Sequence, residues 1–266
     1  MPTREENLRP DPAARRAALR WLVLLDAAVR LTVWTTSFAA ASWVVSLLGI
    51  VPERGPFSRS PIAAVKWAWF LSAWLLLFNV TYLLTLVGLR ALVPTPREGA
   101  YETEVLGGDR NIVWAVIAGI LTWARLTPAA PGFLVQQLCG LPPLCWLVER
   151  VMGPRTKSAW FLQPKVMDAY LVDIGANVVI GYGAIISPHA QVRETFLLKR
   201  IVIEDDVLIG ANSIVMGGTR IGKGAMIGAG AIVPPDTQIG ANEFWGGVPA
   251  KKIRDLPALC SRAAAS

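Results

Sequence analysis

Histidine is almost absent from this chain, because His189 is the only one in 266 residues. The three cysteines, Cys139, Cys145 and Cys260, have neither the spacing of a metal site nor that of a disulfide framework. Catalytic zinc generally requires three protein ligands, so we expect no metal. Lys and Arg outnumber Asp and Glu by 26 to 19. No basic stripe is interleaved with aromatic residues, so we expect no nucleic-acid partner either.

Charged residues are also scarce. They make up 17% of the chain against 53% for hydrophobic residues, and the mean hydropathy is +0.45. This composition argues against a wholly soluble or disordered protein. Nine of the eleven tryptophans precede residue 150, which predicts membrane association for the first half and a different character for the second.

Two long runs, 31–51 and 67–89, contain no charged residue. A helix needs about 20 apolar residues to cross the hydrocarbon core, so the sequence predicts a transmembrane helical pair within 31–110, preceded by a basic amphipathic segment, 1–30. Arginines of that segment favour a cytoplasmic amino terminus, and two spans return the second half to the cytoplasm. We therefore expect a multi-pass protein of the cytoplasmic (inner) membrane, without a cleavable signal because no small-residue cleavage site follows the first run.

The segment 111–164 is apolar up to residue 148 but is interrupted by prolines at 128, 131, 142 and 143. Proline breaks helices, so we expect interfacial or re-entrant helices and a linker instead of a straight span. Asn79, inside the second run, is expected to hydrogen-bond between helices in preference to marking an acceptor pocket. Asp26 and Arg30 stand four residues apart and can pair, but a solvated helix face is the preferred explanation.

A six-residue repeat organises the second half. Ile or Val recurs at 174, 180, 186 and 192 and, after an interruption, at every sixth position from 203 to 239, with Trp245 closing the series. Small residues often stand four positions later, and Gly, Asn or Asp stand three positions later, where a sharp corner favours positive φ. The corner residues are Asn177, Gly183, Asp206, Asn212, Gly218, Gly224, Gly230, Asp236 and Asn242. This pattern predicts a parallel β-helix over residues 165–256, followed by a tail, 257–266.

The motifs IEDDVLIGANSIV (203–215), IGKGAMIGAGAIV (221–233) and GGVPAKKIRDL (246–256) resemble those of the hexapeptide-repeat acyltransferases. The resemblance implies a left-handed β-helix, since the period alone gives no hand. Membrane helices that lead into DAYLVDIGANVVIG (168–181) and end in FWGGVPAKK (244–252) are similar to the carboxy-terminal domains of poly-lysine-type nonribosomal peptide synthetases. No adenylation or carrier domain accompanies them, so that likeness concerns domain arrangement. The γ-type carbonic anhydrases share the fold but hold zinc with three histidines, which a single histidine excludes.

His189 stands at a corner position, three residues after Ile186 and just before RETFLLKR (193–200) interrupts the repeat. A histidine that merely tolerates positive φ would look the same. The resemblance instead implies a general base, because family members carry such a histidine before a loop that helps to enclose the acceptor. An imidazole with an ordinary pKa of about 6.5 suits proton removal from an attacking hydroxyl or amine. The resemblance also implies that the Ala211 backbone N–H stabilises the oxyanion.

The donor implied by the resemblance is acyl-CoA. Lys251 and Arg254 match phosphate-contacting positions, and Ala229 matches a backbone contact along the pantetheine arm; a solvated basic end cap is the other explanation for the two cations. Two departures remove family contacts: Pro234-Pro235 replaces a frequent Thr-Lys, and Leu208 a frequent Trp. An acyl or peptidyl carrier protein therefore stays open as an alternative thioester donor.

The sequence thus predicts a membrane-anchored acyltransferase with acetyl as the expected acyl group. Family members assemble as trimers with active sites between subunits, which implies a homotrimer here. Anchoring in the lipid bilayer predicts a membrane-associated acceptor, such as a lipid-linked saccharide, a growing surface polymer or a lipid hydroxyl or amine. The alternative is a non-catalytic β-helix scaffold or assembly module, which Leu208 and Pro235 would favour.

Overall fold

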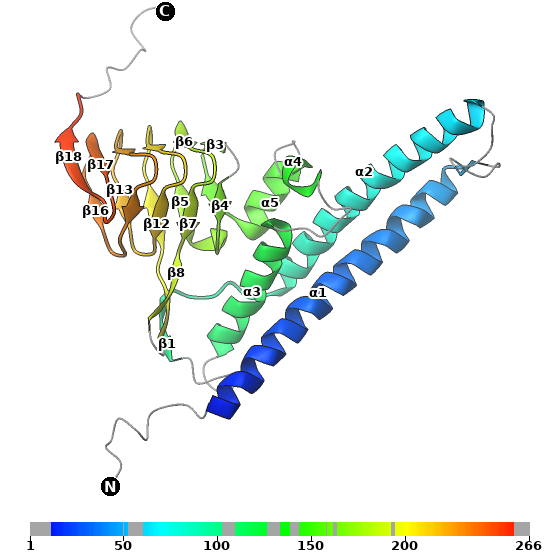
Figure 1. Ribbon diagram of the computed structural model, residues 1–266, viewed down its shortest axis with the longest axis horizontal. Coiled ribbons are helices and arrows are strands. Elements are labelled where there is room, and N and C mark those ends of the chain that lie inside the picture. Colours follow the sequence, from blue (N-terminus) through cyan, green and yellow to red (C-terminus); the bar gives the residue numbers. More distant parts are fainter. Residues whose placement is uncertain are drawn as a thin grey trace, which may run out of the picture. The chain divides into compact units, whose positions relative to one another are not determined.

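The chain folds into two compact units. The computed structural model describes residues 12–49, 51–52, 61–102, 110–126, 134–138, 144–157, 159–161, 164–192 and 195–257. One unit comprises Met1–Val93 and Trp123–Val148, and the other comprises Pro94–Thr122 and Glu149–Ser266 (Figure 1). Within the described residues, the first unit is helical and the second contains every strand.

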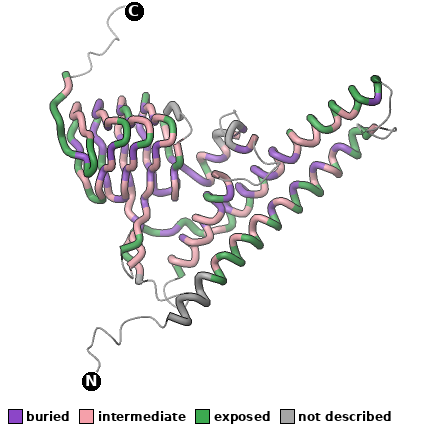
Figure 2. Tube along the Cα trace, in the orientation of Figure 1, coloured by how far each residue is buried: buried purple, intermediate pink, exposed green. Residues whose placement is uncertain are grey.

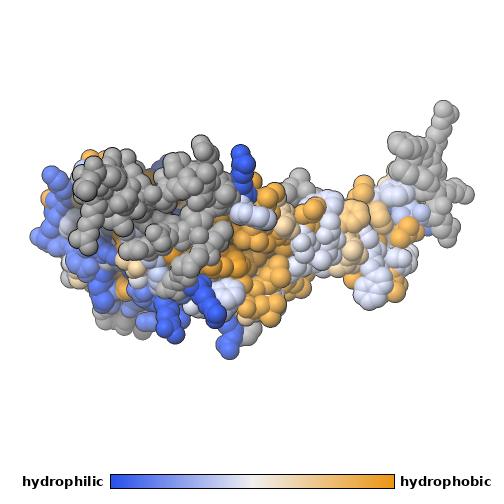
Figure 3. Space-filling model, turned by 90° about the horizontal axis from the view of Figure 1, so that it is seen from below, coloured by the Kyte–Doolittle hydropathy of each residue, from blue (hydrophilic) through white to orange (hydrophobic). Residues whose placement is uncertain are grey.

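Two long helices, α1 (Pro12–Leu47) and α2 (Pro61–Leu92), dominate the helical unit. The segments Arg20–Leu47 and Pro61–Leu92 are long and apolar enough to cross a membrane, by length and composition. Apolar side chains cover the outer surface of these helices (Figure 3). Helix α1 is continuous from Pro12 to Leu47, so it joins the described part of the predicted segment 1–30 to most of the first apolar run.

Polar contacts inside this unit decide two predictions. Asn79 is buried, donates to the Leu75 carbonyl and accepts from the Leu134 backbone N–H at 3.0 Å, so the prediction that it bonds between helical elements is confirmed. Asp26 and Arg30 form an ion pair at 2.9 Å. The two residues therefore pair, as their spacing allows, on a helix face that stays partly exposed.

Three shorter helices follow α2: α3 (Arg110–Leu126), α4 (Val135–Leu138) and α5 (Leu144–Met152). The four prolines expected to interrupt this region lie outside the described residues, between these helices. A single straight span is absent from the described part of the region. Its interfacial or re-entrant placement stays a prediction.

Three sheets make up the β-helix (Figure 1). We call them the first sheet (β16-β13-β10-β5-β2), the second sheet (β18-β17-β14-β11-β6-β3) and the third sheet (β15-β12-β7-β4). From residue 155 to residue 246, apart from 189–198, successive strands visit the three sheets in turn, so each coil pairs in parallel with its neighbours. The final strand, β18, instead pairs antiparallel with β17. The strands are β2 (Arg155–Thr156), β3 (Ala159–Phe161), β4 (Lys165–Val166), β5 (Val172–Ile174), β6 (Val178–Ile180), β7 (Ile185–Ser187), β10 (Ile201–Ile203), β11 (Leu208–Ile209), β12 (Ile214–Met216), β13 (Arg220–Ile221), β14 (Met226–Ile227), β15 (Ile232–Val233), β16 (Gln238–Ile239), β17 (Glu243–Gly246) and β18 (Lys251–Asp255). The stack begins at Arg155, two strands ahead of the expected residue 165.

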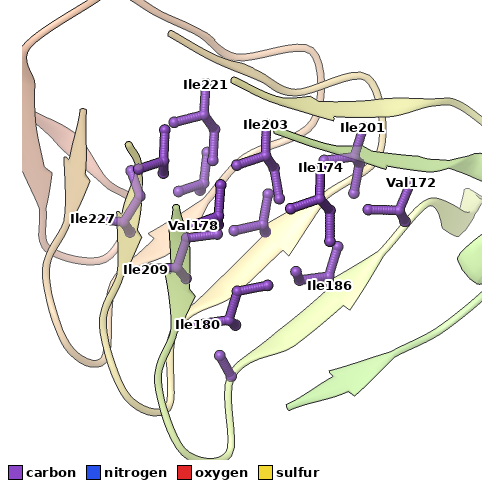
Figure 4. Close-up of a cluster of buried hydrophobic side chains, with 14 of the residues drawn as sticks. Val172, Ile174, Val178, Ile180, Ile186, Ile201, Ile203, Ile209, Ile221 and Ile227 are labelled. Carbon is purple, nitrogen blue, oxygen red and sulfur yellow. The ribbon is translucent and has the colours of Figure 1, made fainter. Parts of the chain in front are cut away.

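Stacked aliphatic side chains form the core of this helix (Figure 4). In the second sheet, for example, Ile180 pairs with Ile209 and Ile209 pairs with Ile227. Ten of the twelve predicted inward positions are buried, alternating with more exposed neighbours along the tube of Figure 2. Each fully buried aliphatic stabilises the fold by about 1.5–3 kcal/mol. Trp245 is partly buried against this core, whereas Val192 is 53% exposed and its predicted inward position is wrong.

Val192 is exposed because the chain leaves the coil there. Strands β8 (His189–Val192) and β9 (Thr195–Leu198) form an antiparallel hairpin in place of a corner. A third strand, β1 (Gly99–Glu102), pairs antiparallel with β9, giving the order β1-β9-β8 (Figure 1). Nothing in the repeat pattern predicted β1.

Candidate functional site

Turns at three edges of the β-helix connect its sheets, and the predicted site residues Ala211 and Ala229 lie in such turns. All nine predicted corner residues have positive φ, which confirms the reading of the repeat. The corner between the second and third sheets holds Ala211 and Ala229, after β11 and β14. His189 follows β7, at the point where the chain leaves the third sheet and enters the hairpin before it reaches the first sheet. The two sets of residues therefore lie at different edges of one chain.

His189 does not occupy a strained corner. The described residues with positive φ do not include it, and it begins strand β8. The expected corner position was therefore wrong, because the hairpin replaces the corner at this point. A backbone conformation with positive φ therefore does not explain the presence of histidine at position 189.

Asp168 is the partner of His189. The imidazole Nδ1 and a carboxylate oxygen, Oδ2, of Asp168 form a hydrogen bond and ion pair. Asp168 lies one coil below, in the turn between β4 and β5, with positive φ of 40°. Its side chain is 4% exposed, and its other oxygen, Oδ1, accepts from the Tyr170 hydroxyl at 3.3 Å.

This pair fixes how the imidazole can react. A carboxylate only accepts hydrogen bonds, so Nδ1 of His189 carries the proton and Nε2 presents a lone pair when the ring is neutral. The hydrogen bond to Asp168 raises the pKa of His189 above its ordinary value, and burial of the ring opposes that rise. The ring is thus a stronger base than free imidazole, and its reactive nitrogen is defined.

An aromatic ring holds the other side of the imidazole. Phe196, on β9, stacks on His189 with ring centroids 5.7 Å apart and an interplanar angle of 24°. The side chain of His189 remains 36% exposed. The ring is consequently oriented by two partners while part of its surface stays accessible to a reactant.

Ala211 and Ala229 follow glycines in closely stacked coils. A Cβ on Gly181 would lie 2.5 Å from Ala211 N, and a Cβ on Gly210 would lie 2.4 Å from Ala229 N. Glycine at these two positions lets the backbone of one coil approach the next. Among the described residues, the Ala211 N–H donates to no protein acceptor.

The predicted phosphate-binding cations lie on β18, the last strand of the second sheet. Lys251 and Arg254 are both exposed, and the Arg254 guanidinium lies 5.9 Å from the centroid of the Phe244 ring. Lys252 is engaged elsewhere, with Glu243 at 2.7 Å and Asp255 at 2.8 Å. Of the basic residues on this strand, Lys251 therefore has the most freedom to meet an anion.

Asp168, Tyr170 and Phe196 were missed by sequence reasoning. Asp168 opens the DAYL stretch just before the first regular repeat, 21 residues from His189, and no periodicity connects the two. Only the stacking of one coil on another brings them together. Within the residues that the structure describes, no three His, Cys, Asp or Glu side chains gather as a metal site would require.

Known proteins share this repeat. Residues 200–235 match the family model described as bacterial transferase hexapeptide (six repeats). YvoF, a candidate acetyltransferase of Bacillus subtilis (strain 168), is 32% identical over 130 residues, covering 46% of this chain and 74% of that protein. A 2,3,4,5-tetrahydropyridine-2,6-dicarboxylate N-acetyltransferase of Staphylococcus aureus (strain JH9) is 48% identical over 80 residues, covering 30% of this chain but only 31% of that enzyme. Among solved structures, the hexapeptide-repeat acetyltransferase VCA0836 of Vibrio cholerae has a TM-score of 0.40 at 19% identity, covering 57% of this chain and 95% of its own.

The hexapeptide repeat that forms this β-helix is the feature that the matched family model describes. The chain belongs to the hexapeptide-repeat acetyltransferase family, as its identity with YvoF over most of that protein shows. The prediction of an acyltransferase is thereby confirmed.

Proposed function

We propose that this chain is a membrane-anchored acetyltransferase that moves an acyl group from acyl-CoA to a hydroxyl or amine of a membrane-associated acceptor, with His189 as general base. The observation that carries the proposal is the hydrogen bond between His189 and buried Asp168. A scaffold would not require the only histidine of the chain to be bonded to a buried carboxylate. Such a pair is the arrangement that general-base catalysis uses.

The reaction proceeds through one tetrahedral intermediate. Nε2 of His189 takes the proton as the acceptor oxygen or nitrogen attacks the thioester carbonyl carbon. The oxyanion that forms accepts a hydrogen bond from the Ala211 backbone N–H. The intermediate collapses by breaking the carbon–sulfur bond, and the thiolate of CoA takes the proton from the imidazolium. No acyl-enzyme is needed, so the only chemical demand on the chain is a base with a free Nε2 and a fixed N–H donor.

The donor site combines the corner of Ala229 with the exposed cations Lys251 and Arg254. Exposed cations suit the phosphates of acyl-CoA. Acetyl is the proposed acyl group, as in the names of both curated relatives. Leu208 is 39% exposed, and Pro235 is exposed as well, so the two departures from the family pattern face solvent. A carrier protein in place of CoA is the alternative donor that this surface leaves open.

The proposed assembly is a homotrimer of left-handed β-helices. His189 and Ala211 lie at opposite edges of the third sheet of one chain, so a complete site takes its base from one copy and its oxyanion donor from a neighbour. Co-expressing His189→Asn with Gly181→Ala tests this arrangement. Each variant alone is expected to be inactive, but mixed assemblies with two-subunit sites regain about a quarter of the activity. No regain in verified mixed oligomers would refute the shared site.

The proposed location is the cytoplasmic membrane, with the β-helix on the cytoplasmic side and the acceptor held at the bilayer. Two apolar helices of sufficient length support anchoring, and colocalisation supports a lipid-linked saccharide, a surface polymer or a lipid group as acceptor. The likeness to poly-lysine-type synthetase domains stays a prediction about domain arrangement.

The decisive experiment incubates purified full-length protein with radiolabelled acetyl-CoA and a membrane extract. Label is expected in the lipid-extractable fraction, and His189→Asn is expected to reduce transfer by about 10²–10⁴-fold while circular dichroism shows a retained fold. Equal transfer by both proteins would overturn the general-base role. Label that appears only in water-soluble products would overturn the membrane-held acceptor.

A further inference from the structure

We propose that strand β1 and the Glu98 carboxylate beside it position the catalytic hairpin, so that the segment leaving α2 is a working part of the acyltransferase site. This inference rests on the proposed role of His189. It assigns a positioning function to residues that lie far before the β-helix in the chain.

The pairing of the strands supplies the first step. β1 pairs with β9 over four residues, from Gly99 opposite Leu198 to Glu102 opposite Thr195. β9 pairs in turn with β8, where His189 lies opposite Leu198. β9 is therefore the central strand of a three-stranded sheet whose edge strand carries His189. A two-stranded hairpin is marginally stable by itself, and a third strand adds the pairing that orders it.

An ion-pair clamp holds β1 in register. Arg200 Nε lies 2.7 Å from Glu98 Oε1, and the Arg200 backbone N–H donates to Glu98 Oε2 at 3.1 Å. The same guanidinium reaches Asp173 on β5, with Nη1 3.0 Å from Oδ2. One arginine at the foot of the hairpin thus joins the start of β1 to a coil of the β-helix, and its planar fork suits this double contact.

Side chains from α3 and β1 fix the residue before the clamp. The Arg97 backbone N–H donates to Asn111 Oδ1 at 2.9 Å, and Asn111 Nδ2 donates to the Arg97 carbonyl at 3.2 Å. The Tyr101 hydroxyl donates to the same carbonyl at 2.8 Å. Three hydrogen bonds to the backbone N–H and carbonyl of Arg97 thus restrain the start of β1 against sliding along β9.

The constraint reaches the imidazole through Phe196. This residue lies opposite Tyr101 on β1 and opposite Gln191 on β8, and its ring stacks on the diagonal neighbour, His189. Asp168 fixes Nδ1 from the coil below, while Phe196 fixes the plane of the ring from the hairpin. Loosening β9 would therefore let the base tilt, and a misplacement of about 1 Å costs on the order of 100-fold in rate.

A short tether links this device to the apolar helices. Residues 93–98 separate α2 from β1, and an extended chain of that length spans at most about 25 Å. A fragment that begins after residue 150 lacks both Glu98 and β1. Loss of activity in such a fragment would reflect damage to the site as well as loss of the membrane helices.

The test uses the full-length chain with Glu98→Gln, and Glu204→Gln as the matched control. Glu204 accepts from Arg220 at 2.6 Å and from the Lys223 backbone N–H at 3.0 Å, which copies the contacts of Glu98 on a coil without the hairpin. We expect Glu98→Gln to lower kcat for acetyl transfer by about 10- to 100-fold with the KM for acetyl-CoA unchanged. We expect Glu204→Gln to retain the kcat of the wild type.

The only histidine of the chain supplies an independent readout. With ¹³C-labelled histidine, NMR titration follows His189 alone, and its pKa is expected to fall toward the ordinary value in Glu98→Gln because the bond to Asp168 loosens. Wild-type kcat and pKa in Glu98→Gln, with His189→Asn inactive, would overturn the positioning role and leave the general base intact. Equal losses in both glutamine variants would also overturn it, as a general effect on stability. Activity in His189→Asn would overturn the proposed function itself.

Discussion

Replacing Asp168 with asparagine tests the reactive state of His189 with the least structural change. Asparagine has the same shape and tolerates the positive φ that Asp168 adopts, whereas alanine would add backbone strain there. Asparagine also keeps a partner for the Tyr170 hydroxyl. The change therefore removes one thing, the charge that holds Nδ1 of His189 protonated.

The expected loss follows from what the amide can do. If the amide oxygen faces Nδ1, the ring keeps its tautomer but loses the charge that stabilises the imidazolium. If the amide NH₂ faces Nδ1, the proton moves to Nε2 and the base disappears. Since general-base catalysis contributes about 10²–10⁴-fold, we expect kcat to fall within that range.

The dependence on pH gives a second measure of the same change. The Asp168 bond raises the pKa of His189, so wild-type activity rises with pH through a value above about 6.5, as the imidazole becomes neutral. In Asp168→Asn the inflection is expected at lower pH, with a lower plateau. The pair also stabilises the fold fully below about pH 6.5 and less as the pH rises through the raised pKa, so the deficit in free energy of unfolding should shrink over that window.

The assay follows transfer from radiolabelled acetyl-CoA to membrane extract between pH 5.5 and 9, alongside urea unfolding at the two ends of that window. An Asp168→Asn protein with wild-type kcat and an unshifted pH profile would refute the reasoning, because the carboxylate would then have no influence on the base.

Three further predictions follow from the geometry of the β-helix. Gly181→Ala places a Cβ 2.5 Å from Ala211 N, so we expect kcat to fall by about 10²–10³-fold from displacement of one oxyanion donor; an unchanged kcat in a folded variant would remove Ala211 from the site. Lys251→Ala is expected to raise the KM for acetyl-CoA about tenfold with kcat retained. The reason is that the proposed phosphate contact of Lys251 is the same in the ground state and the transition state. A change confined to kcat would contradict a binding role. Ile209→Ala should lower the free energy of unfolding, measured by urea titration, by about 2–5 kcal/mol, because the Ile209 side chain is buried. Val192→Ala, at an exposed position, should change the free energy of unfolding by less than about 0.5 kcal/mol. Similar values for the two variants would contradict the structure.

Much of the β-helix was predictable because its repeat is local. Each hexapeptide must turn a corner and bury one aliphatic side chain, so Gly, Asn and Asp recur at fixed spacing, and residues such as Asn177 and Asn212 adopt the predicted positive φ. The prediction failed at Val192, where the periodic pattern continues but the chain departs into a hairpin. An aliphatic residue every six positions therefore does not distinguish a regular coil from a hairpin that keeps the same spacing.

The site was only half visible in the sequence. His189 was easy to select because the chain contains no other histidine. The sequence nevertheless showed no residue that could pair with it. Asp168 lies 21 residues away and has no motif of its own, and β1 precedes the repeats altogether. Such contacts depend on the stacking of the coils, which brings Asp168 to His189, and on the pairing of β1 with the edge of the hairpin at β9.

The sequence by itself determined the two apolar runs, the hexapeptide fold, the family and the residue to suspect, because hydropathy, periodicity and rarity are properties of neighbouring positions. Tertiary structure alone decided which groups surround that residue. The stacking of one coil on the next brings the Asp168 carboxylate to Nδ1 of His189, and the pairing of β1 with β9 places Glu98 beside Arg200. Both events join segments that are distant in the chain, and the energy that selects them comes from backbone pairing and charge, which no local pattern records.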